Sequence, residues 1–207
     1  MYRLILILSF ISSSLVFSQK DSLDVNNKLS FSISPHHLLE LYHGTSINGG
    51  CEYQINKRFS LDTEFGYYFS SAVSDYIALK GFTLTQGIKY YFDNPTYFEF
   101  QTIYGYQDYW RNDSILNDSK MSYQNQKKFL DFSFRYGKRF MFRNRFIFNP
   151  YIGVGIRIHN LSSTLLTWQM NNRVLGDWNN PKTWIHEAGT KTYLKVHLGF
   201  KFGIRIF

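Results

Sequence analysis

Two groups of residues, each containing histidines, have side chains that could take part in catalysis or metal binding. In the first, His159 precedes Ser162 and Ser163, and His186-Glu187 follows shortly before the end of the chain. A hydroxyl activated by an imidazole, which a carboxylate orients, is the arrangement of nucleophilic hydrolases. Ser163, His159 and Glu187 would form it if the fold brought them together. No compact motif fixes their spacing, so these residues are interpreted as ordinary polar residues of a loop. No catalytic residue is predicted.

The second group is His36, His37 and His43, with Glu40 among them. Imidazole nitrogens suit zinc and other transition metals, so this cluster could bind a metal ion. No cysteine or carboxylate at a fixed turn or helix spacing completes the set. A solvated loop is the simpler interpretation, and the sequence predicts neither a metal nor a cofactor.

The tryptophans fall at or beyond the ends of predicted strands, at Trp110, Trp168, Trp178 and Trp184. Rings at such positions anchor a membrane protein at the level of the lipid headgroups, or pack loops. The segment from Trp168 to Trp184 could instead form a binding platform, since loops often carry function.

Long alternating strands must position all of these residues, and the last one is the clearest. From residue 194 to 206, large apolar residues occupy every second position and polar residues or glycine lie between them: Leu194, Val196, Leu198, Phe200, Phe202, Ile204 and Ile206 against Lys195, His197, Gly199, Lys201, Gly203 and Arg205. A period of two gives a strand one apolar face and one polar face. Soluble strands run about 5 to 6 residues, whereas a tilted strand crosses a membrane in about 9 to 11. The pattern therefore predicts a membrane strand.

Composition agrees with a membrane barrel. Aromatic residues make up 19% of the 207 residues, yet the mean hydropathy is −0.28, which suits strands with one polar face better than apolar helices. The net charge is +8, but the sequence contains no run of Lys and Arg longer than a pair. Nucleic-acid binding is therefore not predicted. The single cysteine, Cys51, excludes an internal disulfide and falls on an apolar face.

The chain divides into three parts. Residues 1–19 have one basic residue, Arg3, before an apolar core of signal-peptide length, with cleavage expected near Ser18 or Gln19. Residues 20–28 form a polar lead-in, and residues 29–207 form one barrel domain. The chain is therefore expected to be exported.

Eight strands are predicted, and their connections alternate between long and short. The strands are 29–34, 45–54, 59–69, 82–92, 97–110, 128–140, 146–158 and 190–207. The long connections are 35–44, 70–81, 111–127 and 159–189, and the short ones are 55–58, 93–96 and 142–145. This rhythm is typical of an all-β, antiparallel, up-and-down transmembrane β-barrel with tight turns at one end and extended loops at the other.

These features resemble the small eight-stranded outer-membrane barrels of the OmpA/OmpX type, including compact barrels of Bacteroidota. The resemblance covers residues 29–207 and rests on the signal peptide, the strand count, the loop asymmetry and the terminal Phe207, which is out of step with the apolar face that Ile206 ends. It implies location in the outer membrane of a two-membrane bacterium, contact with lipopolysaccharide and other outer-membrane lipid, and insertion by the barrel assembly machinery.

If the apolar faces point to lipid, charged side chains of both signs fill the interior: Glu52, Asp62, Glu64, Lys89, Glu99, Asp131, Arg135, Arg139, Arg157, Lys195, His197, Lys201 and Arg205. Eight strands leave an interior only wide enough for side chains, so paired charges would plug it. Glycines on the same face, at 66, 87, 105, 137, 153, 155, 199 and 203, would leave room for long side chains.

The predicted function is a barrel without catalysis that serves envelope structure or presents its outer loops for surface interaction. Three alternatives stay open: a lipid A-modifying enzyme that uses rim histidines, a narrow channel, and a soluble exported lipocalin-like barrel. The last would turn the apolar faces inward.

Overall fold

The computed structural model describes residues 29–34, 45–69, 77–114, 120–164 and 188–206. The predicted signal peptide and lead-in therefore lie outside the described residues, as do the 36–43 histidine cluster, His186, Glu187 and three of the four tryptophans. The strands are β1 Leu29–Ser34, β2 Thr45–Gln54, β3 Phe59–Phe69, β4 Ile77–Tyr91, β5 Thr96–Ser114, β6 Lys120–Lys138, β7 Phe140–Phe142, β8 Phe146–Ser163 and β9 Gly189–Ile206.

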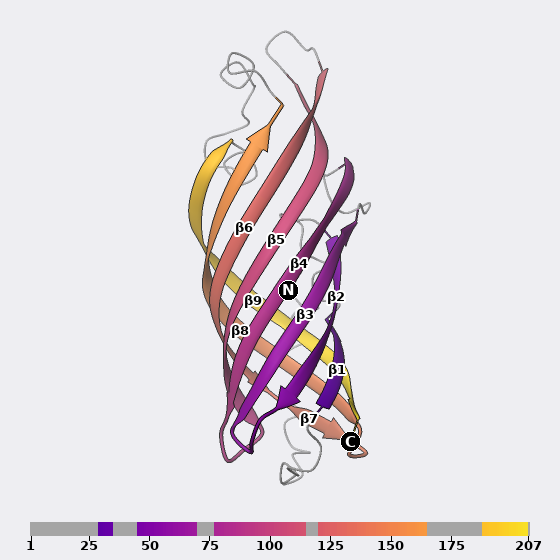
Figure 1. Cartoon of the computed structure of the whole chain (residues 1–207), viewed down its shortest axis with the longest axis vertical. Coiled ribbons are helices and arrows are strands. Elements are labelled where there is room, and N and C mark those ends of the chain that lie inside the picture. The colour runs from indigo at the N-terminus through magenta and orange to yellow at the C-terminus, as the bar shows by residue number, and fades with distance from the viewer. Residues whose placement is uncertain (1–28, 35–44, 70–76, 115–119, 165–187, 207) are drawn as a thin grey trace, which may run out of the picture.

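The strands form a closed antiparallel ring (Figure 1). From β1 to β6 each strand pairs with the next along the chain. β6 then pairs with β8, β8 with β9, and β9 returns to pair with β1. The short β7 continues β6 beyond a break at Arg139 and pairs with the start of β8, so the ring has eight strands. The predicted fold, an eight-stranded up-and-down antiparallel barrel, is confirmed.

The pairing register fixes the tilt and width of the barrel. Following paired residues once around the ring from Ile206 leads back to β9 at Val196, ten residues away (206 − 196), by way of Leu29, Tyr53, Leu61, Ile88, Phe100, Phe134 and Val154. With a rise of about 3.3 Å per residue and about 4.8 Å between strands, this stagger gives a tilt of roughly 40° and a backbone radius of about 8 Å. Side chains alone can fill so narrow an interior.

Tight turns join the strands at one end, which also holds the end of β9 (Figure 1). We call it the turn end and the opposite one the loop end. Asn56 Oδ1 accepts hydrogen bonds from the backbone N–H groups of Arg58 and Phe59, each at 2.8 Å. Arg143 and Asn144 have φ values of 51° and 53°, the left-handed values that the two central residues of a type I′ turn require.

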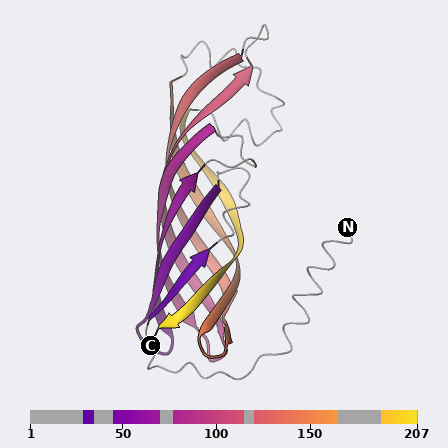
Figure 2. The same ribbon diagram turned by 90° about the vertical axis from the view of Figure 1, so that its right-hand side faces the viewer.

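Strands at the loop end run further than predicted (Figure 2). β5 continues to Ser114 and β6 begins at Lys120, so most of the predicted 111–127 loop is a hairpin. β4 likewise begins at Ile77, and β8 continues to Ser163. Most outward positions described there are polar, such as Gln126, Asn160 and Ser162, so the apolar alternation ends while the backbone ladder continues.

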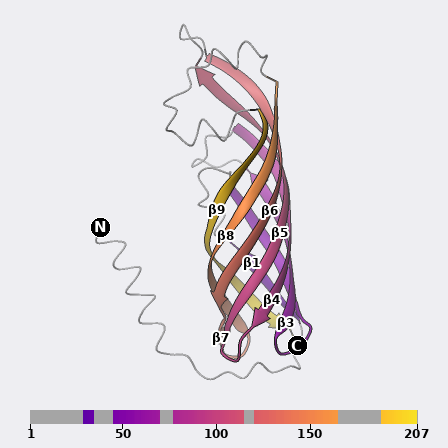
Figure 3. The same ribbon diagram turned by 90° about the vertical axis from the view of Figure 1, so that its left-hand side faces the viewer.

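At the turn end the prediction was also inexact. The predicted strand 128–140 is interrupted at Arg139, and Figure 3 shows β7 as a separate short strand there. The backbone N–H of Arg139 donates 2.8 Å to the carbonyl of Pro95, in the neighbouring turn. Phe142 belongs to β7, which leaves three residues, 143–145, in the turn.

The two faces of the ring differ sharply. Most outward side chains are apolar and exposed, by 43% to 76% at Phe65, Leu84, Phe98, Phe134, Val154 and Leu198. Inward positions are mostly polar or charged, and Lys89 and Asp62 are 0% and 1% exposed. The soluble alternative needs the reverse arrangement, with apolar side chains inside. The structure has the orientation predicted for a membrane barrel.

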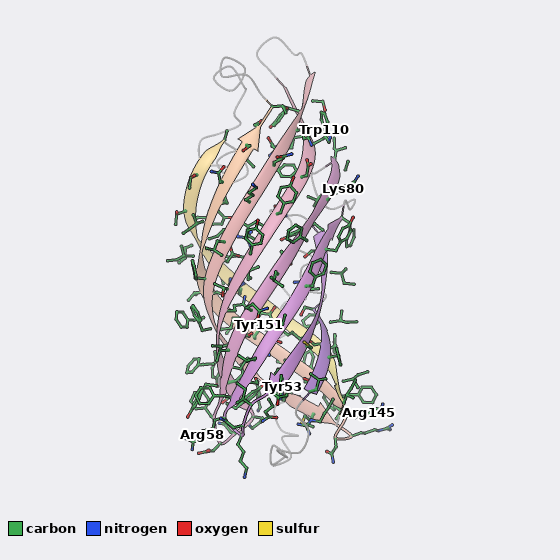
Figure 4. All side chains as sticks on the ribbon, viewed as in Figure 1. Tyr53, Arg58, Lys80, Trp110, Arg145 and Tyr151 are labelled. Carbon is green, nitrogen blue, oxygen red and sulfur yellow. The ribbon has the colours of Figure 1, made fainter. Side chains whose placement is uncertain are left out.

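The apolar exterior is a belt with charged borders (Figure 4). On the loop side, outward positions become polar at Lys80, Asp108, Lys128 and Asn160, which adjacent strands bring to a similar level. On the turn side the belt ends at exposed basic residues of the turns, Lys57, Arg58, Arg143 and Arg145. Between these borders each long strand contributes about ten residues, or about 25 Å along the axis at the tilt above.

Candidate functional site: the charged interior

All the charged and histidine side chains predicted to face inward are buried, except that of Arg205, which is partly exposed. They come from every long strand of the ring. Since side chains along each long strand point alternately inward and outward, an odd or even position relative to the apolar residues was enough to identify the inward ones.

Glu52, on β2, is the centre of the group nearest the turn end. Its carboxylate accepts hydrogen bonds from Lys89 Nζ at 2.7 Å, Tyr91 Oη at 2.8 Å and Ser60 Oγ at 2.7 Å. Arg139 Nη2 also donates to it. The Arg139 guanidinium lies 4.6 Å from the centre of the Tyr91 ring, as in a cation–π contact. Two buried cations thus share one carboxylate.

Lys201, on β9, links the end of the chain to its third strand. Its Nζ lies 2.5 Å from Asp62 Oδ2 and also contacts the Glu64 carboxylate. Lys89 Nζ lies 3.2 Å from the same Asp62 oxygen, and Ser34 Oγ donates 3.2 Å to Glu64 Oε2. The ion pairs therefore form one network across the interior, not separate pairs.

A second ion-pair group lies nearer the loop end. Arg157 on β8 donates to both oxygens of Asp131 on β6, at 2.6 and 2.5 Å. Its guanidinium stacks 4.1 Å from the Phe129 ring centre, and Lys195 Nζ lies 3.7 Å from Asp131. This bidentate geometry is the strongest form of an Arg–carboxylate pair.

Arg135 sits between the two groups. Its guanidinium lies 4.3 Å from the Tyr151 ring centre, and one of its nitrogens is 3.4 Å from His197 Nδ1. The predicted role of the glycines is seen here, because a side chain on Gly153 would collide with Arg135 and one on Gly87 with Glu99. Gly105 and Gly137 leave room instead for the rings of Phe129 and Tyr97.

Buried ion pairs lie inside the space that the ring encloses. In the half nearest the turn end, four carboxylates face four cations: Glu52, Asp62, Glu64 and Glu99 against Lys89, Arg135, Arg139 and Lys201. A cavity between the two ion-pair groups, lined by Asn48, Glu64, Tyr68, Arg135 and Arg157 among others, has a volume of about 10 Å³. Such a volume is about that of a single water probe, so it offers no water-filled path.

Sequence reasoning missed an apolar layer inside the barrel toward the loop end. Tyr68, Leu79, Ile103, Tyr109, Phe129 and Leu161 pack together there, each 4% exposed or less. Ile103, which interrupts the alternation of its strand, points inward into this layer. Tyr97, Tyr109 and Tyr123 are also inward and buried. The signal that could have placed them was their parity with a charged inward residue of the same strand, Glu99 on β5 and Asp131 on β6.

The residues of the alternative hydrolase arrangement are not brought together where the structure describes them. His159 lies within β8, not in a loop, and is 1% exposed, with its ring in edge contact with that of Tyr193 at 5.5 Å. Ser162 occupies the opposite, exposed face of the strand. Ser163 shares the inward face but lies four residues further, about 13 Å along a strand. The fold thus separates His159 from both serines.

Within the described ranges, no group of three or more His, Cys, Asp or Glu side chains could hold a metal ion. Those ranges also contain no helix of the length and hydropathy that a membrane span needs. Trp110 lies outward on β5, 42% exposed and paired with Ile77, on the loop side of the belt (Figure 4).

These features define a class of protein: a closed eight-stranded antiparallel barrel with an apolar exterior and with buried ion pairs in its interior. The chain belongs to the family described as "Protein of unknown function (DUF3575)", whose model matches residues 11–197. No curated protein matches the sequence. Among solved structures, it is similar to a major outer membrane protein from Thermus thermophilus, at 11% identity and a TM-score of 0.40, covering 86% of this chain and 98% of that chain.

Proposed function

We propose that the protein is an integral outer-membrane barrel whose turn end faces the periplasm and whose loop end faces outward. The observation that carries this proposal is the apolar belt with its two charged borders. Its height of about 25 Å equals the apolar band of outer-membrane barrels. A soluble monomer rarely exposes an apolar patch larger than a few hundred Å², and this belt surrounds the whole ring.

The interior acts as a plug, so the barrel is a scaffold rather than a pore. The ion pairs of the network join different strands, or β2 to the break at Arg139, and so connect the wall from inside. The role that fits is envelope structure, or presentation of the loop end to a surface partner. Lipopolysaccharide, outer-membrane lipid and the barrel assembly machinery are the partners proposed, and catalysis is no part of the proposal.

Cell fractionation combined with heat-modifiable gel migration tests membrane insertion. The protein is expected in the outer-membrane fraction, migrating faster in SDS before boiling than after it, because a closed barrel resists SDS until heated. Recovery of the mature protein from the periplasm in soluble form would refute the proposal.

Two further measurements separate the scaffold from its alternatives. Purified barrel in planar bilayers is expected to give no stepwise conductance, and discrete openings would favour the narrow channel. Lipid A from cells that express the wild type or His159→Ala is expected to have the same mass as lipid A from cells without the protein. A mass change that depends on His159 would favour the enzyme.

A further inference from the structure

A large hollow lies on the outside of the barrel, in the belt. It is a groove of about 1050 Å³ that runs over β8, β9, β1, β2 and β3. This volume is at the upper end of the range of small-molecule sites, about 300–1,000 Å³. Its lining is almost entirely apolar and includes Phe31, Ile33, Phe65, Phe146 and Phe202.

Small outward residues create the groove. Elsewhere on the belt most outward positions carry Phe, Tyr, Leu, Ile or Val, but here β2 and β3 contribute Gly49, Cys51 and Thr63. Gly49 pairs with Ile33 and Phe65, and Cys51 pairs with Phe31 and Thr63. A side chain added at Gly49 would meet nothing within 4 Å. The small side chains of Gly49, Cys51 and Thr63 therefore form the floor of the groove, and larger neighbouring side chains form its walls.

The groove ends at the turn side against two arginines. Phe142 and Phe146 line it, and the turn that joins them carries Arg143 and Arg145, both exposed. Arg145 is labelled in Figure 4 at the same lower corner where Figure 1 shows β1 and the end of β9. The positive φ of Arg143 belongs to the tight turn that holds the pair there. An apolar groove thus opens beside a cationic rim.

We propose that this groove binds one glycerophospholipid, with an acyl chain along Gly49 and Cys51 and the phosphate at Arg143 and Arg145. The inference rests on the proposed membrane insertion. In hydrocarbon no water can fill an apolar hollow, and the inner leaflet next to the turn end is built from glycerophospholipids. Arginine guanidinium groups bind phosphate oxygens by paired, charge-assisted hydrogen bonds.

A second copy of the chain fits the groove less well. Two barrels with the same orientation in a membrane are related by an axis along the membrane normal, so identical residues meet at the same depth. A contact through this face would place the two Arg143–Arg145 turns beside each other, where like charges repel. The cations favour an anionic lipid as the occupant.

Native mass spectrometry of the purified, folded barrel in detergent, titrated with phosphatidylglycerol, tests the proposal. The wild type is expected to retain one lipid. Arg143→Gln/Arg145→Gln is expected to weaken binding at least tenfold, and Gly49→Phe to abolish it by filling the floor. Inorganic phosphate at the same concentration is expected not to compete, because it lacks the acyl chain.

Two variants serve as matched controls. Arg58→Gln removes an arginine beside an exposed phenylalanine, Phe59, at the same end but in a different turn, where it lies 3.6 Å from Asp93. Val154→Phe adds similar bulk to the belt on β8, outside the groove. Both are expected to bind lipid as the wild type does, and every variant is first shown to be folded by its heat-modifiable migration.

Three results would overturn the inference. Equal weakening by Arg58→Gln would mean that lipid binds the basic turns without selectivity. Unchanged binding by Gly49→Phe would remove the groove from the site, and dimers without bound lipid would assign the face to a second copy. Failure of the proposed function would appear separately, as absence of the native protein from the outer membrane.

Discussion

Replacing Glu52 by Gln should destabilise the barrel more than most interior changes. Among the described residues, Glu52 is the only carboxylate that pairs with Arg139, whereas Lys89 keeps Asp62 at 3.2 Å. The amide loses the charge and can turn an N–H group toward both cations. Removing one partner of a buried pair costs about 3–5 kcal/mol, mainly because the other charge stays buried. Glu52 and Arg139 are each 5% exposed, so solvent screening of this ion pair is small.

A double-mutant cycle in lipid vesicles measures this effect. Urea unfolding, followed by the folded fraction on unboiled gels, is compared for the wild type, Glu52→Gln, Arg139→Met and the double variant. Arg139→Met should cost less than Glu52→Gln, because Glu52 keeps Lys89, Tyr91 and Ser60. The double variant should recover about 1–3 kcal/mol relative to the sum of the single changes, since no uncompensated charge is left. A loss below about 1 kcal/mol for Glu52→Gln, or strict additivity, would refute the reasoning.

Other substitutions test the belt and the packing of the interior. Leu198→Arg puts a charge near the middle of the belt and should cost about 2–4 kcal/mol in vesicle unfolding, whereas Thr190→Arg, outward on the same strand beyond the belt, should cost about 0–1 kcal/mol; equal costs would place the belt elsewhere. Gly153→Ile should prevent a heat-modifiable barrel from forming, because its side chain would collide with Arg135 and the backbone of β6, while Val154→Ile on the opposite face should fold normally. Normal folding of Gly153→Ile would show that the interior can rearrange.

The sequence was sufficient to predict which way most side chains face. Side chains of a strand point alternately to its two faces, so the direction of one side chain sets the direction of all the others. Glu99 and Lys201 were therefore predicted to face inward although their contacts on other strands were unknown. Strand ends at the loop side were predicted less well, because the polar outward residues beyond the belt no longer distinguish strand from loop. His159 was misplaced for that reason.

Pairing within the interior could not be predicted. Arg139 donates to Glu52, which is 87 positions away, and Lys201 contacts Asp62, 139 positions away. Such contacts depend on the stagger of the whole ring, which no single strand encodes. The external groove is likewise a property of the assembled wall, because Gly49, Cys51 and Thr63 form one floor only after β1, β2 and β3 pair.

The position of Lys201 has a consequence for assembly. Asp62 and Glu64 lie on β3, whereas the lysine that contacts both lies on β9 and is made 139 positions after Asp62. A nascent sheet that lacks β9 would carry these two carboxylates with one cation fewer, and uncompensated charge is costly within a membrane. Arrival of the last strand thus supplies both the missing backbone partners of β1 and the missing counter-charge of β3. A chain that stops before β9 therefore lacks both the backbone partners of β1 and the counter-charge of Asp62 and Glu64. Closure of the barrel and neutralisation of these buried charges occur in the same step.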